Sequence, residues 1–518
     1  MKYPIGIQSF EKLREEGCVY VDKTDLVYRM VDRGHVYFLS RPRRFGKSLL
    51  ISTLEAYFKG RKDLFKGLAI ERLETDWNEH PVFRLDFNGK NFNNPGELQD
   101  AINYFVVSAE REYGVETPAD NIGDRFVNVL RAASKQYGRR AVVLVDEYDK
   151  PLLDVINTPI EDKNRETLKA FYSVFKLADE YLQFVLLTGV TKFSQISVFS
   201  GFNQPIDISL DPRYEAICGI TEAELDKYFT ARIQEMADET GITPEKMKDE
   251  IKQMYDGYHF SERMTDIYNP FSLFSSLDQG RLDAFWFRTG TPTYLIQLME
   301  SVDENIDEMV GRYYDSSQFI DYKADTQMPL PMIYQSGYLT IKGYNSRTKA
   351  FKLDFPNNEV KKGFLTMIAN SYLKTKGDSA SWVLDTVDAL DAGDLERFRK
   401  LLTAFLASIP YSQRRRGTER EQERDFQYTF YLLLRMISSF LVFTEKETSE
   451  GRADCVIETR EHVYIFEFKR DGTAAEAIGQ INARGYAREY VADSRRIYKI
   501  GCSFSTQTGT VSDWAVEE

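Results

Sequence analysis

The stretch from His35 to Phe58, HVYFLSRPRRFGKSLLISTLEAYF, holds the pattern that decides the fold of the N-terminal half. An apolar run forms a short strand, a basic loop follows, and Gly46-Lys47-Ser48 opens an amphipathic helix. A strand, a tight loop and a helix N-terminus together present backbone N–H groups to an anion. The stretch therefore predicts a phosphate-binding loop, although Arg41 stands where the usual pattern has a glycine.

The residue types in this loop suit contact with a nucleotide. Lys47 places a point charge at the terminal phosphates, Ser48 supplies an oxygen to Mg²⁺, and Gly46 lets the backbone approach the anion closely. Arg43 and Arg44 add positive charge, which we expect either to contact phosphate or to face a partner. The arginine and proline that open the loop restrict its backbone, so binding is a firmer prediction than hydrolysis. The predicted nucleotide contacts are Arg43, Arg44, Phe45, Gly46, Lys47, Ser48 and Leu49.

A second motif, VVLVDEYDKP (142–151), supplies the acidic half of the predicted site. Its apolar run leads directly into Asp146 and Glu147, which puts two carboxylates at the carboxyl end of a predicted strand, where α/β sheets bind ligands. We expect Asp146 to hold Mg²⁺ and Glu147 to polarise the attacking water. Thr188 or Thr191, after the next apolar run, is expected to contact the γ-phosphate. The competing interpretation is a strand that ends in a solvated acidic turn, with the threonine only capping its own strand.

The N-terminal part of the chain alternates short apolar runs with helical patterns. Near-continuous apolar runs are typical of parallel strands that are covered by helices on both faces. This alternation predicts a doubly wound α/β domain. The expected strands are 36–39, 82–87, 141–146, 184–190 and 206–210.

After this domain the sequence pattern changes from alternating strands and helices to mostly helices. ITEAELDKYF begins a mostly helical region with a capping-box-like pair, Thr221 and Glu224. Further on, SGYLTIKGYNSRTKAFKLDFPN predicts a β-hairpin whose helical flanks resemble a winged-helix layout. We therefore expect four parts: a P-loop domain at 1–220, a helical lid at 221–330, a winged-helix-like or helical linker region at 331–410, and a C-terminal α/β domain at 411–518.

Composition limits the classes of protein that this chain can be. Its 67 Lys and Arg residues stand against 80 Asp and Glu residues, a net charge of -13. That balance excludes a surface coated in positive charge for DNA, although it is compatible with a local basic groove. The four cysteines form no CxxC pair, the N-terminus has no signal-peptide core, and no apolar run approaches the ~20 residues of a membrane span. We expect a cytoplasmic protein that does not enter a membrane.

The C-terminal part contains a second group of chemically suitable residues. In GRADCVIET and HVYIFEFKR, Asp454 lies on one predicted strand, and Glu467 and Lys469 lie on the next. Residues two apart on a strand point to the same face, so the carboxylate and the ammonium converge, and Asp454 can join them across the hairpin. Two carboxylates that hold a metal, here Asp454 and Glu467, with a nearby lysine suit metal-assisted phosphodiester hydrolysis. The competing interpretation is an ordinary Glu-x-Lys charge pattern on an exposed strand.

Several motifs together resemble the bacterial AAA-ATPase-like family. They are RPRRFGKS, YVDKT (20–24), VDEYDKP, TGVTKFSQISVFSGFNQ and YNPFSLF, and they span roughly residues 1 to 290. The resemblance implies P-loop ATPase chemistry with ATP and Mg²⁺, in which Lys47 and Ser48 contact phosphate and metal and Asp146 with Glu147 forms the second acidic element. For Asp22, in YVDKT, a place near the nucleotide and a role at a helix start both stay open.

The C-terminal residues resemble the PD-(D/E)xK nuclease superfamily, in the version that accompanies AAA-ATPase-like domains. The resemblance covers about residues 420 to 500. It implies a restriction-endonuclease-like α/β fold in which Glu423 is the acid of the preceding helix and Gln480 with Tyr486 belongs to the following helix. Asp454, Glu467 and Lys469 fill the remaining catalytic positions.

We interpret the chain as an ATP-binding protein, an ATPase coupled to a Mg²⁺-dependent nuclease-like domain that acts on nucleic acid. The alternative is a nucleotide-dependent switch whose C-terminal domain binds nucleic acid or protein without cleaving. A third class is a structural module used for dimerisation. The sequence leaves open whether the nucleic acid is DNA or RNA, and whether the chain forms a homo-oligomer.

Overall fold

The chain folds into two compact units, Met1–Lys361 and Lys362–Glu518, in a computed structural model. We call them unit 1 and unit 2. The described residues are 1–116, 121–156, 158–192, 205–289, 309–320, 329–364, 379–408, 441–448, 451–459, 461–505, 507–508 and 510–518.

Unit 1 is built on a five-stranded sheet in the order β2-β3-β4-β1-β5, and every neighbouring pair is parallel. The predicted parallel α/β sheet is therefore confirmed. The fifth strand is shorter than its predicted range, because only two of its residues pair with β1 at the sheet edge. The strands are β1 (Val36–Ser40), β2 (Val82–Asp86), β3 (Ala141–Asp146), β4 (Leu182–Gly189) and β5 (Ile206–Asp207).

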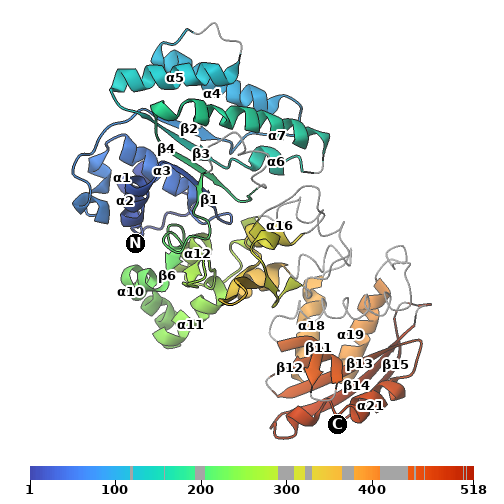
Figure 1. Cartoon of the computed structure of the whole chain (residues 1–518). Helices are drawn as coiled ribbons and strands as arrows, with labels where there is room; N and C mark the ends of the chain where they lie inside the picture. Colours follow the sequence, from blue (N-terminus) through green and yellow to red (C-terminus); the bar gives the residue numbers. More distant parts are fainter. Residues whose placement is uncertain are drawn as a thin grey trace. The chain divides into compact units, whose positions relative to one another are not determined.

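Helices cover both faces of this sheet, as its apolar strands require. Figure 1 shows α4, α5 and α7 on one side of the sheet and α1, α2 and α3 on the other. Every residue of β3 is buried, so the strand that carries Asp146 lies inside the core. The helices are α1 (Phe10–Glu15), α2 (Thr24–Arg33), α3 (Lys47–Phe58), α4 (Glu97–Tyr113), α5 (Ile122–Tyr137), α6 (Lys150–Leu153), α7 (Pro159–Tyr172) and α8 (Val174–Leu177), with short 3₁₀ turns η1 (Lys62–Phe65), η2 (Ala69–Arg72) and η3 (Asp179–Tyr181).

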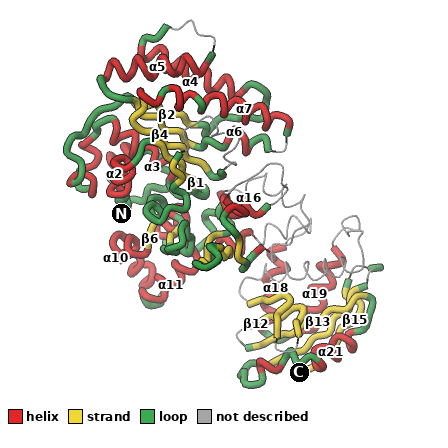
Figure 2. The backbone as a smooth tube through the Cα atoms, in the orientation of Figure 1, coloured by secondary structure: helices red, strands yellow, loops and turns green. Residues whose placement is uncertain are grey.

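The rest of unit 1, which we call its helical part, combines helices with loops and short strands (Figure 2). The capping box predicted at Thr221 and Glu224 is present at the start of α10, and the predicted hairpin forms β9 and β10. Its elements are β6 (Ile220–Thr221), α10 (Glu222–Thr240), α11 (Pro244–Tyr255), β7 (Ile267–Tyr268), α12 (Pro270–Gln279), η4 (Phe287–Thr289), β8 (Tyr313–Tyr314), α15 (Ser317–Ile320), α16 (Leu330–Gln335), β9 (Thr340–Asn345) and β10 (Ala350–Asp354). The boundary between the two units lies after Lys361, inside the range 331–410 that was predicted from the sequence to be a single region.

Unit 2 is a mixed five-stranded sheet in the order β11-β12-β13-β14-β15, in which β13 and β14 are parallel. The predicted strand pair is present as β12 and β13, and the helix expected after it is present as α21, which contains Gln480 but ends before Tyr486. The two edge strands, β11 and β15, were not predicted, because polar residues interrupt their apolar pattern. The elements are α18 (Ser379–Asp391), α19 (Leu395–Ser408), β11 (Leu441–Thr448), β12 (Gly451–Glu458), β13 (His462–Arg470), α21 (Ala474–Ala483), η6 (Arg488–Tyr490), β14 (Arg496–Phe504) and β15 (Val511–Glu517).

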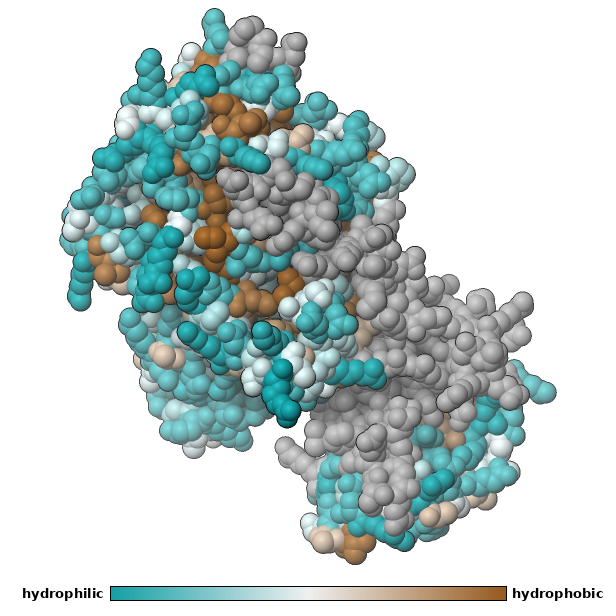
Figure 3. Space-filling model, viewed as in Figure 1, coloured by the Kyte–Doolittle hydropathy of each residue, from teal (hydrophilic) through white to brown (hydrophobic). Residues whose placement is uncertain are grey.

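Hydrophilic side chains cover most of the described surface that is visible in Figure 3, with smaller hydrophobic areas on unit 1. In the part of the chain that the structure describes, no helix has both the length and the apolar character that a membrane crossing needs.

Candidate nucleotide and metal sites

The phosphate-binding loop predicted from the sequence joins β1 to α3. Strand β1 ends at Ser40 beside Gly189 of β4, and the helix begins at Lys47. Two loop residues adopt left-handed backbone conformations, Arg44 with φ 67° and Gly46 with φ 94°. Glycine suits its position because a side chain is strained at such a φ. Arg41 is not among the described residues with positive φ, so the first loop position does not need a glycine.

Backbone N–H groups line this loop and the first turn of α3. Among the described residues, the N–H groups from Arg43 to Leu49 have no hydrogen-bond acceptor. The first N–H groups of a helix are unpaired by construction, and the helix dipole adds partial positive charge there. The loop therefore has the donors that a bound phosphate needs.

Lys47 is buried behind this row of amides. Its Nζ donates to the carbonyl oxygens of Arg41 at 2.9 Å and Pro42 at 3.1 Å, which closes the loop on itself. Burial lowers the pKa of the Lys47 ammonium, and the carboxylates of Glu147 and Asp146 oppose that shift. The ammonium is thus held next to the loop and near the acidic strand end.

The two predicted acidic residues lie at the carboxyl end of β3. Asp146 is buried, and its Oδ1 accepts a hydrogen bond from the Thr188 hydroxyl on β4 at 2.7 Å. Its Oδ2 has no partner among the described residues. Glu147 has φ 51°, and burial raises the pKa of its carboxyl while Lys47 lowers it. A buried carboxylate oxygen without a donor fits a cation ligand, so the Asp146 position suits Mg²⁺.

Two further acids at this sheet edge were missed by the sequence reasoning. Asp149 is buried, and its Oδ2 accepts hydrogen bonds from Val190 N at 3.0 Å, Thr191 N at 2.6 Å and Thr191 Oγ1 at 2.7 Å. It therefore shapes the chain that follows β4. Asp86 ends β2 and pairs in register with Asp146. The position of Asp86 could have been predicted, because VFRLD ends in an acid just as AVVLVD does. The contact between Asp149 and Thr191 could not, because no sequence pattern links the two residues.

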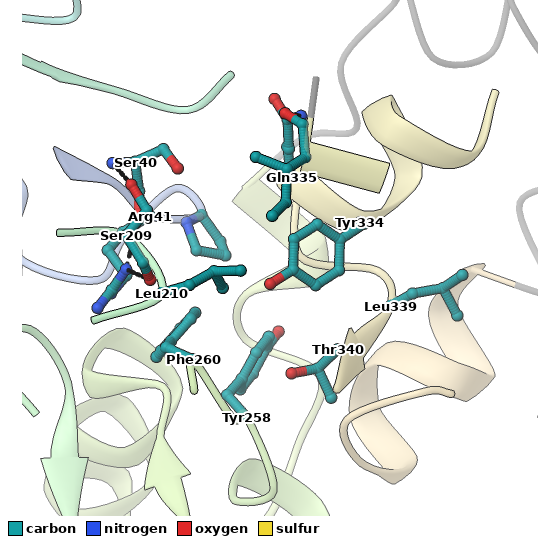
Figure 4. A pocket seen from close by; sticks show the side chains of 12 residues that line it. Ser40, Arg41, Ser209, Leu210, Tyr258, Phe260, Tyr334, Gln335, Leu339 and Thr340 are labelled. Carbon is teal, nitrogen blue, oxygen red and sulfur yellow. Dashed lines mark hydrogen bonds between the residues drawn. The ribbon is translucent and has the colours of Figure 1, made fainter. Parts of the chain in front are cut away.

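Figure 4 shows Arg41, the residue that replaces the usual glycine, beside Ser40 and Ser209. It is 1% exposed, and its guanidinium donates to the carbonyl oxygens of Ser209 at 2.8 Å and Tyr214 at 3.3 Å. The same group lies 4.0 Å from the ring centroid of Phe260, a cation–π contact. Burial lowers the pKa of Arg41. Arg41 thus fixes the start of the loop to the core.

The loop side chains also contact the helical part of unit 1. Phe45 lies edge-on to Tyr258, with ring centroids 4.8 Å apart. The Arg44 guanidinium lies 5.1 Å from the centroid of Phe271, and the Arg43 side chain is exposed. Phe45 is therefore a packing residue in this structure, and Arg43 remains accessible to a ligand or partner.

Asp22 has a structural role at the start of α2. Its Oδ1 accepts from the Thr24 N–H at 2.9 Å and from the Thr24 hydroxyl at 2.7 Å, and its Oδ2 accepts from Ala69 N at 2.7 Å. Of the two roles considered for Asp22, these contacts support the helix start. The neighbouring Lys23 forms an ion pair with Glu224, the acid of the α10 capping box, at 2.6 Å.

The second candidate site lies on β12, β13 and α21 of unit 2. The side chains of β13 alternate: Val463 and Ile465 pack with Ile481 of α21, whereas Phe466 contacts Phe398 of α19. Because the strand period is two, Glu467 and Lys469 share the face of Val463 and Ile465. Glu467 and Lys469 therefore lie on the side of the sheet that α21 covers.

The predicted residues of this site come together. Lys469 Nζ donates to Gln480 Oε1 of α21 at 2.6 Å and lies 3.5 Å from Glu467 Oε1. Across the hairpin, Asp454 Oδ2 accepts from Phe468 N at 2.8 Å. Gln480 therefore positions the lysine ammonium beside the carboxylates.

The electrostatics of this group fit a divalent cation. Glu467 is 2% exposed, and its Oε2 has no partner among the described residues. Burial, followed by the Asp454 charge, raises the pKa of Glu467 to about 7, against the opposing effect of Lys469. Two close carboxylates with an unsatisfied buried oxygen suit Mg²⁺. Within the described ranges no third His, Cys, Asp or Glu joins them, and Glu423, the predicted helical acid, lies outside those ranges.

Both sites coincide with matches to known proteins. Residues 4–199 match a family model described as predicted AAA-ATPase, and residues 421–514 match the PD-(D/E)XK nuclease superfamily. A protein of Azotobacter chroococcum mcd 1, "Uncharacterized protein in vnfD 5'region", is 36% identical over 527 residues, which cover 100% of this chain and 99% of that relative. Among solved structures, the Aeropyrum pernix ORC2 protein in its ADPNP-ADP complexes matches at 12% identity with a TM-score of 0.27, over 67% of this chain and 92% of that one.

Proposed function

Because the chain belongs to the family of bacterial proteins that join a predicted AAA-ATPase domain to a PD-(D/E)XK nuclease superfamily domain, we propose that it hydrolyses ATP and cleaves nucleic acid with Mg²⁺. The observation that carries the ATP part is the row of unpaired loop amides beside Lys47 and the unsatisfied oxygen of Asp146. These groups combine donors for phosphate with a ligand for its metal.

In unit 1, the amides of Arg43 to Leu49 and the Lys47 ammonium bind the phosphates. Asp146 and Ser48 hold the metal, and Thr188 keeps the Asp146 carboxylate oriented through its 2.7 Å hydrogen bond. Glu147 orients and deprotonates the attacking water. When bound, Mg²⁺ neutralises charge on the phosphate oxygens at this site and at the site in unit 2.

In unit 2, Asp454 and Glu467 hold the metal. Lys469, kept in place by Gln480, orients the attacking water or stabilises the charge that develops on the scissile phosphate. Glu423, the further acid that the nuclease resemblance implies, would complete this set. Nucleic acid is therefore the proposed substrate and partner of unit 2.

A test of the ATP part compares wild type with Lys47→Met and Glu147→Gln. Lys47→Met removes the buried charge at nearly constant length, so ATP binding and hydrolysis should both be lost. Glu147→Gln should keep ATP binding and lose hydrolysis, because it removes the base and leaves the loop intact. Phosphate release and equilibrium binding of a fluorescent ATP analogue measure the two effects. Tight binding by wild type without phosphate release would favour a nucleotide-dependent switch.

A test of the nuclease part uses Asp454→Asn and Lys469→Met. Both should abolish cleavage of labelled DNA and RNA with Mg²⁺ or Mn²⁺ and leave ATP hydrolysis unchanged. Lys499→Met is the matched control, because Lys499 lies on a strand of the same unit and pairs with Glu517 at 2.6 Å. Failure of wild type to cut any substrate in a broad panel with either metal would contradict the nuclease proposal.

A further inference from the structure

Trp286 contacts the backbone of the nucleotide loop from the helical part of unit 1. Its indole Nε1 donates to the carbonyl oxygen of Arg43 at 3.1 Å, although the two residues are 243 positions apart in the chain. The side chain is 5% exposed, and its ring lies 5.2 Å from that of Tyr338. The indole is therefore held by packing, and its N–H is directed at one loop carbonyl.

A second contact fixes the backbone of Trp286. The Trp286 N–H donates to Glu359 Oε1 at 2.7 Å, and Glu359 is 1% exposed. Glu359 lies in the helical turn that begins at Asn358, just before Lys361 ends unit 1. Trp286 thus connects the nucleotide loop to the segment through which the chain leaves unit 1.

The contact between Trp286 and the Arg43 carbonyl also fixes the orientation of the peptide plane between Arg43 and Arg44. The Arg43 carbonyl and the Arg44 N–H belong to the same planar trans peptide, so they point in opposite directions. A donor that holds the carbonyl outward therefore also fixes the direction of the Arg44 N–H. That N–H is one of the loop amides without an acceptor among the described residues, and Arg44 has φ 67°, which a free loop would rarely adopt.

We propose that Trp286 is a positioning residue of the nucleotide loop: its indole N–H fixes the peptide between Arg43 and Arg44 and so orients an amide for phosphate. This role rests on the proposed binding of ATP. The contact itself exists without nucleotide, so it is testable separately.

The first test is limited trypsin digestion of the nucleotide-free protein. Trypsin cleaves after arginine, and the exposed Arg43 and Arg44 side chains make the bond between them a reporter of loop opening. In Trp286→Phe the aromatic packing stays but the indole hydrogen bond is lost, so cleavage of this bond should rise roughly 2- to 12-fold. Trp382→Phe is the matched control, because the Trp382 indole donates to the carbonyl of Leu401 at 3.0 Å in unit 2. Equal cleavage in both variants and wild type, scored by mass spectrometry of the fragment ends, would overturn the proposal.

The second test measures nucleotide binding. The Kd for Mg-ATP should rise roughly 2- to 12-fold in Trp286→Phe and stay unchanged in Trp382→Phe. A protein that keeps Trp286 alone, with phenylalanine at Trp77, Trp382 and Trp514, should change its emission saturably with added Mg-ATP. Binding without any change in Trp286 emission, or an unchanged Kd in the variant, would refute the positioning role. If wild type binds no ATP but Trp286→Phe still accelerates trypsin cleavage, the loop contact stands and the ATPase proposal fails.

Discussion

Replacing Arg41 by glycine, the usual residue at this loop position, should destabilise unit 1. The guanidinium donates to the carbonyl oxygens of Ser209 and Tyr214 and lies 4.0 Å from the ring centroid of Phe260. Glycine offers no donor and no cation, so the Ser209 carbonyl loses its donor and the Tyr214 carbonyl keeps only the Ile217 N–H. The space of the side chain is left empty. The backbone gains nothing in return, since Arg41 has no positive φ that glycine would relieve.

The expected size follows from these contacts. A desolvated cation–π contact contributes about 2 kcal/mol, and each hydrogen bond from a charged donor about 1.5–3 kcal/mol. Desolvation of the guanidinium offsets part of this gain, which is also why burial lowers the pKa of Arg41. A buried carbonyl left without a donor costs about 1–3 kcal/mol, and the cavity left by a large buried side chain about 2–5 kcal/mol, so with the offsetting desolvation we expect a net loss of about 3–5 kcal/mol for Arg41→Gly.

Urea unfolding measures the loss. In a Trp382→Phe, Trp514→Phe background, the remaining fluorescence comes from Trp77 and Trp286, which both lie in unit 1. Arg43→Gly is the matched control, because it removes an exposed arginine from the same loop at the same cost in backbone entropy. The control should lose about 1 kcal/mol or less.

The reasoning fails if Arg41→Gly and Arg43→Gly unfold at the same urea concentration. It also fails if Arg41→Lys is as stable as wild type, because an ammonium cannot reproduce the planar fork of donors that reaches both carbonyls.

Three other changes test further contacts. Asp149→Ala should lower the stability of unit 1 by about 2–4 kcal/mol in thermal or urea unfolding, because the Thr191 N–H and hydroxyl lose their buried acceptor. Burial raises the pKa of Glu359 from its ordinary 4.5 to about 7, so the folded state keeps this proton longer than the unfolded state and stability falls as pH rises from 4.5 to 7. Glu359→Gln should lack that loss and exceed wild type by about 3 kcal/mol at pH 8 in urea unfolding, with little difference at pH 4.5. Gln480→Ala should slow metal-dependent cleavage about tenfold at unchanged ATP hydrolysis, since Lys469 loses the acceptor that holds it.

The sequence predicted the parts of the fold whose signal is local. The strands of unit 1 are apolar runs because helices bury both faces of the sheet, so their positions could be read directly. The loop between β1 and α3 was equally visible, since its glycine, lysine and serine are adjacent in the chain. Strands β11 and β15 were not predicted from the sequence, because an edge strand pairs on one side only and does not need a continuous apolar pattern.

Long-range contacts could not be predicted in this way. The opening arginine was expected to restrict the loop, but its partners lie more than 160 positions away, at Ser209 and Tyr214. The Trp286 contact joins residues that are still further apart in the chain. Its acceptor is a backbone oxygen, which every residue has, so no residue type in the sequence indicates it. Asp149 was not predicted, because its acceptor role depends on the course of the chain after β4. Such roles depend on which segments meet in the fold.

The main-chain partners of Arg41 have a consequence for how sequences in this family diverge. Each hydrogen bond of the guanidinium among the described residues ends on a carbonyl oxygen, of Ser40, Ser209 or Tyr214. A mutation at any of these three positions changes the side chain and leaves the acceptor in place. The bonds to Arg41 therefore place no demand on the side chains at positions 209 and 214. Those side chains are held by other contacts: Ser209 Oγ accepts from Ser40 N at 2.9 Å, and the Tyr214 ring lies 6.3 Å from that of Tyr37.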